Sequence, residues 1–134
     1  MGLISELKFL EKDKQFRDVS GKYKKEFDFL INLDKHAKAE IKEVIKLVKE
    51  GKVTRAAEKL TTLQTTLSKE MLFLGHIEIF CRKNKLNKEL RILLDAKRKL
   101  WRAMGALNHG GSKIAYVAEK DYVIKKLKEA KSKF

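Results

Sequence analysis

The stretch EGKVTRAAEKLTTLQTTLSKEM, residues 50–71, decides between two ways of folding this chain. Apolar side chains recur along it at steps of three and four residues, at Leu60, Leu63, Leu67, Met71 and then Leu74. Such spacing places side chains on one stripe of an α-helix. The four threonines within residues 61–66 lower helix propensity, but burial of the stripe offsets that cost. The spacing therefore favours one long helix over residues 54–82.

A second interpretation of the same stretch rests on residue identities, which fit the pattern Gly-x-x-T-R-A-A-E-x-L followed by Q-x-x-L-S-[KR]. The matching residues are Gly51, Thr54, Arg55, Ala56, Ala57, Glu58, Leu60, Gln64, Leu67, Ser68 and Lys69. In these positions the chain resembles the DNA-binding segment of LysR-type transcriptional regulators, over residues 50–69 only. The resemblance implies a helix-turn-helix, with Thr54 and Arg55 touching phosphate. It further implies a recognition helix that reads base edges in the major groove through Thr65, Thr66, Ser68 and Lys69.

The composition of the whole chain is typical of an all-α protein. The 134 residues include no proline and only seven glycines. Strand-rich folds need frequent turns and usually mark them with these two residues. Hydrophobic residues make up 43% and charged residues 37%, as in a folded, heavily charged helical protein. We therefore expect helices throughout.

Two helices are predicted before the quoted stretch. Residues 3–16 place Ile4, Leu7 and Leu10 on one stripe and predict a short amphipathic helix. Residues 22–50 repeat apolar side chains at the same helical steps. Gly51 follows this segment, where glycine favours the left-handed conformation that ends helices.

Two further segments follow the quoted stretch. Asn87 is an acceptable N-cap for a helix that we expect to end at GALNHGG, residues 105–111. Ser112 is the expected cap of a last segment. Residues 113–131 are rich in β-branched and aromatic side chains, which leaves a small hairpin open. A helix is favoured there because the segment ends in strong helix formers.

Together these segments predict an all-α, single-domain helical bundle over residues 1–134, with four main helices and a short N-terminal helix. The expected core consists of the large apolar residues on the predicted stripes. These are Phe27, Leu30, Ile41, Val44, Leu60, Leu67, Met71, Leu74, Leu93, Leu100, Trp101 and Met104.

Net charge carries the main functional signal. The chain has 32 basic and 18 acidic residues, a formal charge of +14. The excess is +3 over residues 1–52, +2 over residues 53–83 and +9 over residues 84–134. A field of this sign attracts polyanions, so the basic C-terminal half, residues 84–134, is the expected binding region.

Basic side chains of that half share one side of the predicted helix NKELRILLDAKRKLWRAMG, opposite its leucines. A stripe rich in arginine can follow a phosphate backbone. We therefore predict a non-enzymatic protein that binds nucleic acid, DNA or RNA, mainly through phosphate contacts. The predicted contact residues are Lys88, Arg91, Arg98, Lys99 and Arg102, with Lys125 and Lys126 from the basic tail.

Two other functions stay open from the sequence. The chain can be an adaptor that docks an acidic protein partner or assembles into an oligomer, for which a homodimer is the commonest form. It can also be a helix-turn-helix DNA-binding regulator, as the resemblance implies.

Signals of catalysis and of cofactor or metal binding are missing from the sequence. His36, His76 and His109 lie far apart and form no ligand pair of the His-x-x-x-His kind. The one cysteine, Cys81, falls on an apolar stripe, which predicts a packed thiol. The N-terminus lacks a signal-peptide pattern, and no apolar run is long enough to span a membrane. We therefore expect a cytoplasmic protein that binds no cofactor or metal and does not insert into membranes.

Overall fold

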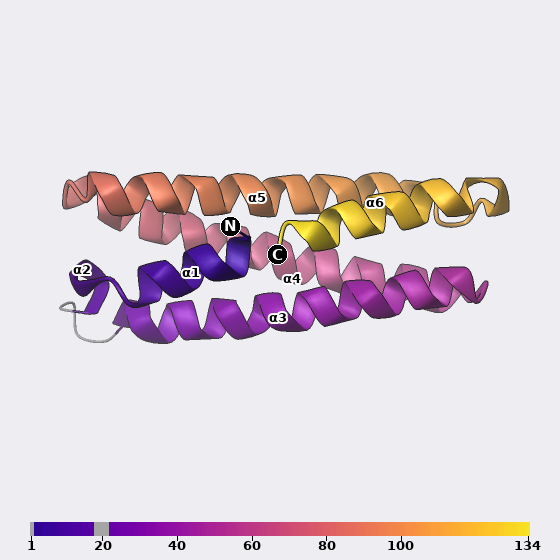
Figure 1. Ribbon diagram of the computed structural model, residues 1–134, viewed down its shortest axis with the longest axis horizontal. Helices are drawn as coiled ribbons and strands as arrows, with labels where there is room; N and C mark the ends of the chain where they lie inside the picture. Colours follow the sequence, from indigo (N-terminus) through magenta and orange to yellow (C-terminus); the bar gives the residue numbers. More distant parts are fainter. Residues whose placement is uncertain (1, 18–21) are drawn as a thin grey trace.

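The computed structural model describes residues 2–17 and 22–134, which are helical almost throughout (Figure 1). The elements are α1 (Leu3–Glu11), α2 (Lys14–Arg17), α3 (Lys22–Lys49), α4 (Val53–Lys83), α5 (Asn87–Ser112), the 3-10 turn η1 (Val117–Glu119) and α6 (Lys120–Ser132). The described residues include no β-strand. The predicted all-α class is therefore confirmed.

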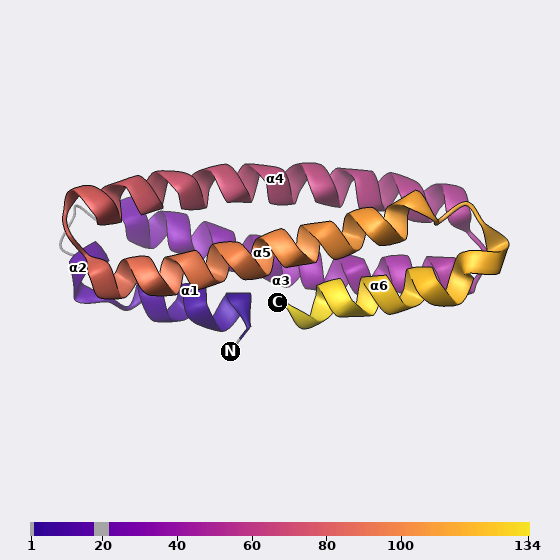
Figure 2. The same cartoon turned by 90° about the horizontal axis from the view of Figure 1, so that it is seen from above.

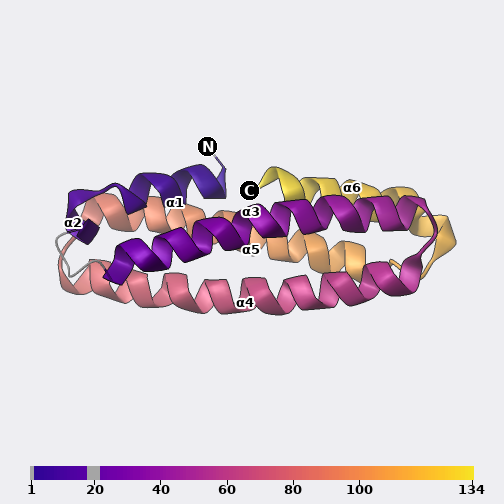
Figure 3. The ribbon, with the colours of Figure 1, turned by 90° about the horizontal axis from the view of Figure 1, so that it is seen from below.

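The three long helices lie side by side, with α3 packed on α4 and α4 packed on α5. Helices α6 and α1 both pack against α3 and α5 and make no contact with α4 (Figures 2 and 3). They lie end to end along the position diagonally opposite α4. The N–H of Leu3 donates to the carbonyl oxygen of Lys133 at 2.8 Å, and that of Ile4 to Phe134 at 3.3 Å. The N-terminal helix α1 is thus part of the bundle. Together with α6 it forms the fourth rod of the bundle, beside α3, α4 and α5.

The helix expected over residues 3–16 divides in two. Helix α1 ends at Glu11 and the short α2 starts at Lys14. Between them, the Asp13 side chain accepts a hydrogen bond from the N–H of Gln15 at 2.9 Å. A side-chain acceptor of this kind starts a new helix, which is why one apolar stripe runs over two elements.

The glycine cap after α3 is confirmed, but the two caps expected around α5 are wrong. Gly51 has φ of 77°, in the left-handed region. Asn87 is the first helical residue of α5 and Leu86 takes the cap position, without a side-chain hydrogen bond. Ser112 ends α5, and its hydroxyl donates to the carbonyl oxygen of His109 at 2.9 Å.

Helix α5 continues through the two glycines at which we expected it to end. A Cβ on Gly110 would lie 3.4 Å from Cβ of Lys126, and one on Gly111 would lie 3.0 Å from Cδ2 of Leu60. These glycines therefore allow α6 and α4 to approach α5 closely, and they do not stop the helix. After α5 the chain forms η1 and then α6, so the helix favoured over the hairpin is confirmed from Lys120 onward.

Helix α4 is continuous from Val53 to Lys83, as the apolar spacing predicted. The hydroxyls of Thr61, Thr62, Thr65 and Thr66 donate to carbonyl oxygens four residues earlier, at 3.0 to 3.2 Å. The geometry that the helix-turn-helix interpretation needs, a turn followed by a new helix start, is not formed. The residues assigned to a recognition helix, Thr65, Thr66, Ser68 and Lys69, lie in the interior of α4.

Most of the predicted core is buried. Phe27, Leu30, Ile41, Val44, Leu60, Leu67, Leu74, Leu93 and Leu100 are at most 2% exposed. Met71 and Met104 are partly buried. Trp101 was wrongly placed in the core, because its side chain is 68% exposed. The apolar face of α5 is wider than the strip that its neighbours cover, and Trp101 lies beyond the edge of that strip.

Candidate polyanion-binding surface

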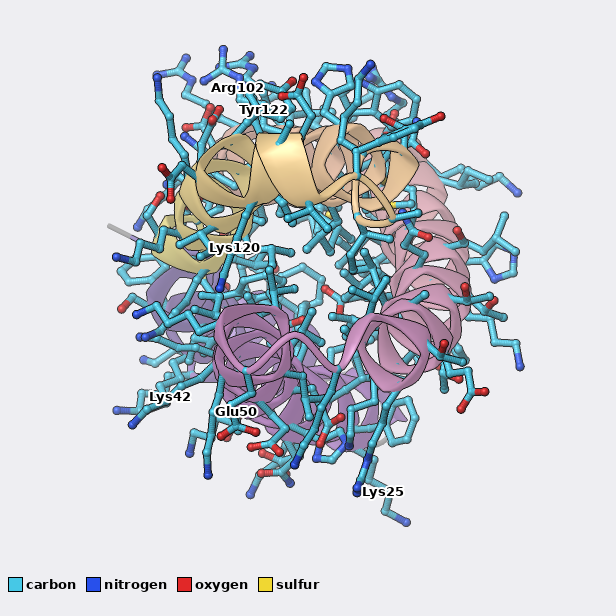
Figure 4. The ribbon with its side chains drawn as sticks, turned by 90° about the vertical axis from the view of Figure 1, so that its right-hand side faces the viewer. Lys25, Lys42, Glu50, Arg102, Lys120 and Tyr122 are labelled. Carbon is cyan, nitrogen blue, oxygen red and sulfur yellow. The ribbon has the colours of Figure 1, made fainter. Side chains whose placement is uncertain are left out.

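Basic side chains gather where α3 and α6 pack against each other. Lysines recur along α3 at steps of three and four residues, which places them on one helical stripe. Lysines of α6 meet this stripe, and Nζ of Lys120 donates to the carbonyl oxygen of Lys49 at 2.9 Å. Lys42 and Lys120, labelled in Figure 4, mark the side on which the two helices meet. We call this surface the lysine seam: Lys35, Lys38, Lys42, Lys46, Lys49, Lys120 and Lys131.

Two open hollows run along the lysine seam. One, of about 420 Å³, is lined by Ile4, Lys35, Lys38, Ala39, Lys42 and Lys131. The other, of about 480 Å³, is lined by Ala39, Lys42, Glu43, Ile45, Lys46 and Lys49. Glu43 is the single acidic residue that lines either hollow. The small side chain of Ala39, shared by both, leaves room for an anion between the surrounding ammonium groups.

The seam is strongly basic because the acidic residues of the N-terminal half are used elsewhere. Glu6 and Asp34 are buried. Glu40 faces α4, where its carboxylate pairs with Nζ of Lys59 at 3.1 Å. Glu50 pairs with Lys52 at 3.2 Å. The near balance of charge over residues 1–52 therefore conceals a surface on which lysines far outnumber acidic residues.

The seven residues predicted from the sequence lie on α5 and α6, and none of them lines the two hollows of the seam. Three of them have acidic partners: Lys99 binds the buried carboxylate of Glu6, while Arg98 pairs with Asp95 and Lys126 with Glu129, both at 3.2 Å. Lys99 thus joins α5 to α1 and is a structural residue.

The other four predicted residues have no acidic partner within 4.0 Å in the part of the chain that the structure describes. They are Lys88, Arg91, Arg102 and Lys125. The ammonium of Lys88 lies 5.6 Å from the centre of the Phe9 ring. Arg102 lies on the same side of the molecule as Tyr122 of α6 (Figure 4). We call Arg91, Arg102 and Lys125 the α5–α6 basic face.

The amino-acid sequence contains a signal for the seam that the charge balance did not reveal. Lys35, Lys38, Lys42, Lys46 and Lys49 repeat at helical steps, and this repeat is visible in the sequence alone. Net charge summed over long segments hid it, because that sum counts acidic residues whatever their direction. Only the packing of α6 on α3 adds Lys120 and Lys131 to the same surface.

A second unexpected feature lies in the core between α3 and α4. Asp34 and Glu70 are fully buried, and their four carboxyl oxygens have no partner outside the pair among the described residues. Burial raises the pKa of both groups, and the neighbouring Asp34 raises the pKa of Glu70 further. Two carboxyls in contact away from water hold a proton between them, because like charges so close cannot both ionise. The sequence carries a signal for both, because Asp34 falls between Leu30 and Ala37, and Glu70 between Leu67 and Leu74, at steps of three and four residues.

The cysteine and the potential metal ligands of the described residues form no reactive site. Cys81 is fully buried, and that burial raises the pKa of its thiol to about 11, as expected for a packed cysteine. In the described part of the chain no three His, Cys, Asp or Glu side chains converge on a position that fits a metal ion. None of the described helices is long and apolar enough to cross a bilayer.

No protein-family model, no curated protein and no solved structure matches this chain.

Proposed function

We propose that this protein binds nucleic acid through phosphate contacts along the lysine seam. The observation that carries the proposal is the stripe of five α3 lysines joined by lysines of α6, with Glu43 as the one acidic lining residue. At a rise of about 1.5 Å per residue, the stripe from Lys35 to Lys49 is about 21 Å long. One strand of a duplex presents about six phosphates over that length, at about 3.4 Å each.

The chemistry of the seam favours contacts to phosphate over reading of base edges. Lysine carries a compact charge on a flexible stem, which suits a phosphate oxygen but supplies no fixed hydrogen-bond geometry. No exposed aromatic side chain lies in either hollow to stack on a base. Binding should therefore depend strongly on salt and weakly on base sequence.

The test compares two triple variants with the same change in net charge. Lys38→Glu, Lys42→Glu and Lys131→Glu alter the seam, whereas Arg91→Glu, Arg102→Glu and Lys125→Glu alter the α5–α6 basic face. Fluorescence anisotropy with a labelled 20-base-pair duplex, made as DNA and as RNA, measures the affinity at several salt concentrations. Circular dichroism checks that both variants keep their helices.

We expect the seam variant to bind at least tenfold more weakly than the α5–α6 variant. The slope of log affinity against log salt should also become shallower by about 3, because three phosphate contacts are lost. Equal losses in the two variants would reject a located site, since total charge alone would explain binding. Equal affinity of the unmodified protein for polyglutamate would reject phosphate as the ligand and favour an acidic protein partner.

A further inference from the structure

Helix α4 and the adjoining side of α5 lie across the molecule from the lysine seam (Figure 4), and both expose large apolar side chains there. Leu72 is 67% exposed, Ile79 52% and Trp101 68%. Each lies on a stripe with helical steps, so the apolar strip is two helices wide. We call it the α4–α5 face: Thr61, Thr65, Ser68, Leu72, Gly75 and Ile79 of α4, with Leu94, Trp101, Gly105 and Asn108 of α5.

The polar groups of this face already have partners within the chain. The hydroxyls of Thr61, Thr65 and Ser68 donate to carbonyl oxygens four residues earlier, at 3.0 to 3.1 Å. Covering these side chains therefore leaves no hydroxyl without a hydrogen-bond partner. This lowers the free-energy cost of burying the face against another surface.

Along the same face one carboxylate offsets part of the charge of two basic side chains. The Glu78 carboxylate accepts from Nζ of Lys97 at 2.6 Å and pairs with Arg82 at 3.1 Å. The hydrogen bond from Lys97 holds the pKa of Glu78 below its ordinary value, so the carboxylate stays ionised at neutral pH. The lysine seam and the α5–α6 basic face, in contrast, carry unpaired positive charge. Two molecules of net charge +14 therefore meet with least repulsion through their α4–α5 faces.

The shape of the face also suits a partner. A hollow of about 490 Å³ lies beside Trp101, lined by Gln64, Met104, Gly105, Asn108 and His109. No atom lies within 4 Å of the position of a Cβ on Gly105, so the floor of this hollow is open. A large side chain from another molecule can enter here next to the tryptophan. Tryptophan is enriched among the residues that contribute most of the binding energy at protein interfaces.

The dimensions fit a small symmetric interface. From Thr61 to Ile79 the face is about 27 Å long, and two packed helices are about 20 Å wide. That area is of the order of the ~800 Å² per partner buried in standard interfaces. The other exposed aromatic pair, Phe29 and Phe73, offers less, because the two rings already pack on each other with centres 6.2 Å apart.

We propose that the α4–α5 face binds the same face of a second copy of this chain, giving a two-fold symmetric dimer with its two lysine seams facing outward on opposite sides. An interface of this kind places the same patch of both copies in contact. The proposal does not depend on nucleic-acid binding, because the two surfaces share no residue.

Sedimentation equilibrium measures the mass, and the fluorescence of Trp101, the only tryptophan in the chain, reports its burial. We expect a dimer at micromolar concentration, with emission that shifts to shorter wavelength and becomes less accessible to iodide as concentration rises. Because both copies are positively charged, added salt should strengthen the dimer. Salt weakens binding to nucleic acid, so the two proposals respond in opposite directions.

The deciding variant is Leu72→Glu with Ile79→Glu, which leaves Trp101 in place as the probe. Its matched control is Tyr116→Glu with Val117→Glu, two apolar residues that are 59% and 85% exposed at the end of the molecule. The first variant should be a monomer with unchanged helicity, and the control should remain a dimer. Both should bind a duplex alike, since they carry the same charge.

Two results would overturn the dimer without touching the proposed function. One is a monomeric unmodified protein at all concentrations up to the millimolar range. The other is a dimer that persists when Leu72 and Ile79 are both glutamate. If instead the dimer forms as expected and neither duplex binds, the proposed function fails and the interface stands.

Discussion

Asp34 and Glu70 hold two carboxyl groups together in the core between α3 and α4, where ionisation is costly. Folding raises the pKa of both groups from their ordinary values of 3.8 and 4.5. The folded protein therefore binds more protons than the unfolded chain at neutral pH. By linkage, the contribution of this pair to stability is largest below pH 4 and declines as pH rises through and above those ordinary values.

Glu70→Gln should therefore stabilise the protein at neutral pH. The amide has the shape of the protonated carboxyl and can donate to the Asp34 carboxylate, but it has no proton to lose. Urea unfolding should show little difference from the unmodified protein near pH 4. Above that, the gain should grow by about 1.4 kcal/mol per pH unit for as long as the folded pair keeps its extra proton.

Glu129→Gln is the control for this prediction, because Glu129 lies on the surface and pairs only with Lys126. Its effect on stability should stay small at every pH. If Glu70→Gln lost stability as pH rose relative to the unmodified protein, the pair would not be holding a buried proton.

At the scale of elements, α4 shows how a helix accommodates residues that disfavour it. Four β-branched threonines within residues 61–66 restrict side-chain rotation, and each turns its hydroxyl back onto the helix. The helix persists because Leu60, Leu63 and Leu67 on the opposite side are buried against the neighbouring helices. Tertiary packing therefore outweighs the local propensity of this segment.

Substitutions at Thr62 test the continuity of α4. In a helix interior, Thr62→Ala should stabilise by a few tenths of a kcal/mol, because alanine has the higher propensity. Thr62→Gly should cost about 0.5 kcal/mol, through the greater backbone freedom of glycine in the unfolded chain. Thermal melts of the two variants measure both changes in stability, and Thr62 is exposed, so neither substitution disturbs the core.

Amide hydrogen exchange tests the continuity of α4 independently. The N–H groups of Leu63, Gln64 and Thr65 should be protected by bonds to carbonyls four residues earlier. Fast exchange confined to these three amides, between protected flanks, would show a helix start there, because the first N–H groups of a helix have no such partners.

For the whole molecule, the most unusual feature is the fourth rod, which is built from both ends of the chain. The N–H groups of Leu3 and Ile4 at the start of α1 donate to the carbonyl oxygens of Lys133 and Phe134, the two residues that follow α6. These bonds give partners to backbone groups that a helix end leaves unpaired. A Cβ on Gly2 would lie only 2.6 Å from the carbonyl oxygen of Phe134, which shows how closely the two ends meet.

A circular permutant follows from this arrangement. Joining Phe134 to Gly2 by a short Gly/Ser linker and opening the chain between Gly51 and Lys52, both exposed, should preserve helicity and a cooperative melt. Opening the chain between Arg98 and Lys99 instead, inside α5, should abolish the cooperative transition. If the first permutant is expressed but lacks helicity or a cooperative melt, the contact between the end of α6 and the start of α1 does not stabilise the fold as proposed.

The sequence by itself determined the helices and most of the core. Apolar residues at steps of three and four residues located α3 and α4 to within a few residues and selected leucines such as Leu67 and Leu100 for burial. These are local properties, because a side chain's direction on a helix depends only on its position along that helix. Local patterns gave the wrong end positions for α5, at Asn87, Ser112 and the two glycines. A glycine can end a helix or can let another helix pack closely, and at Gly110 and Gly111 the neighbouring helices α6 and α4 decide which of these occurs.

Only the tertiary structure decided what the surfaces present. It buried Glu6 and Asp34, directed Glu40 toward Lys59, and so left Glu43 as the one acidic residue that lines the hollows beside the α3 lysines. It also placed Trp101 outside the core, because α4 and α6 cover a narrower strip of α5 than its apolar residues occupy. Charge and exposure depend on which helices meet, and that is set by contacts between residues far apart in the sequence. The lysine seam and the α4–α5 face are both products of such contacts.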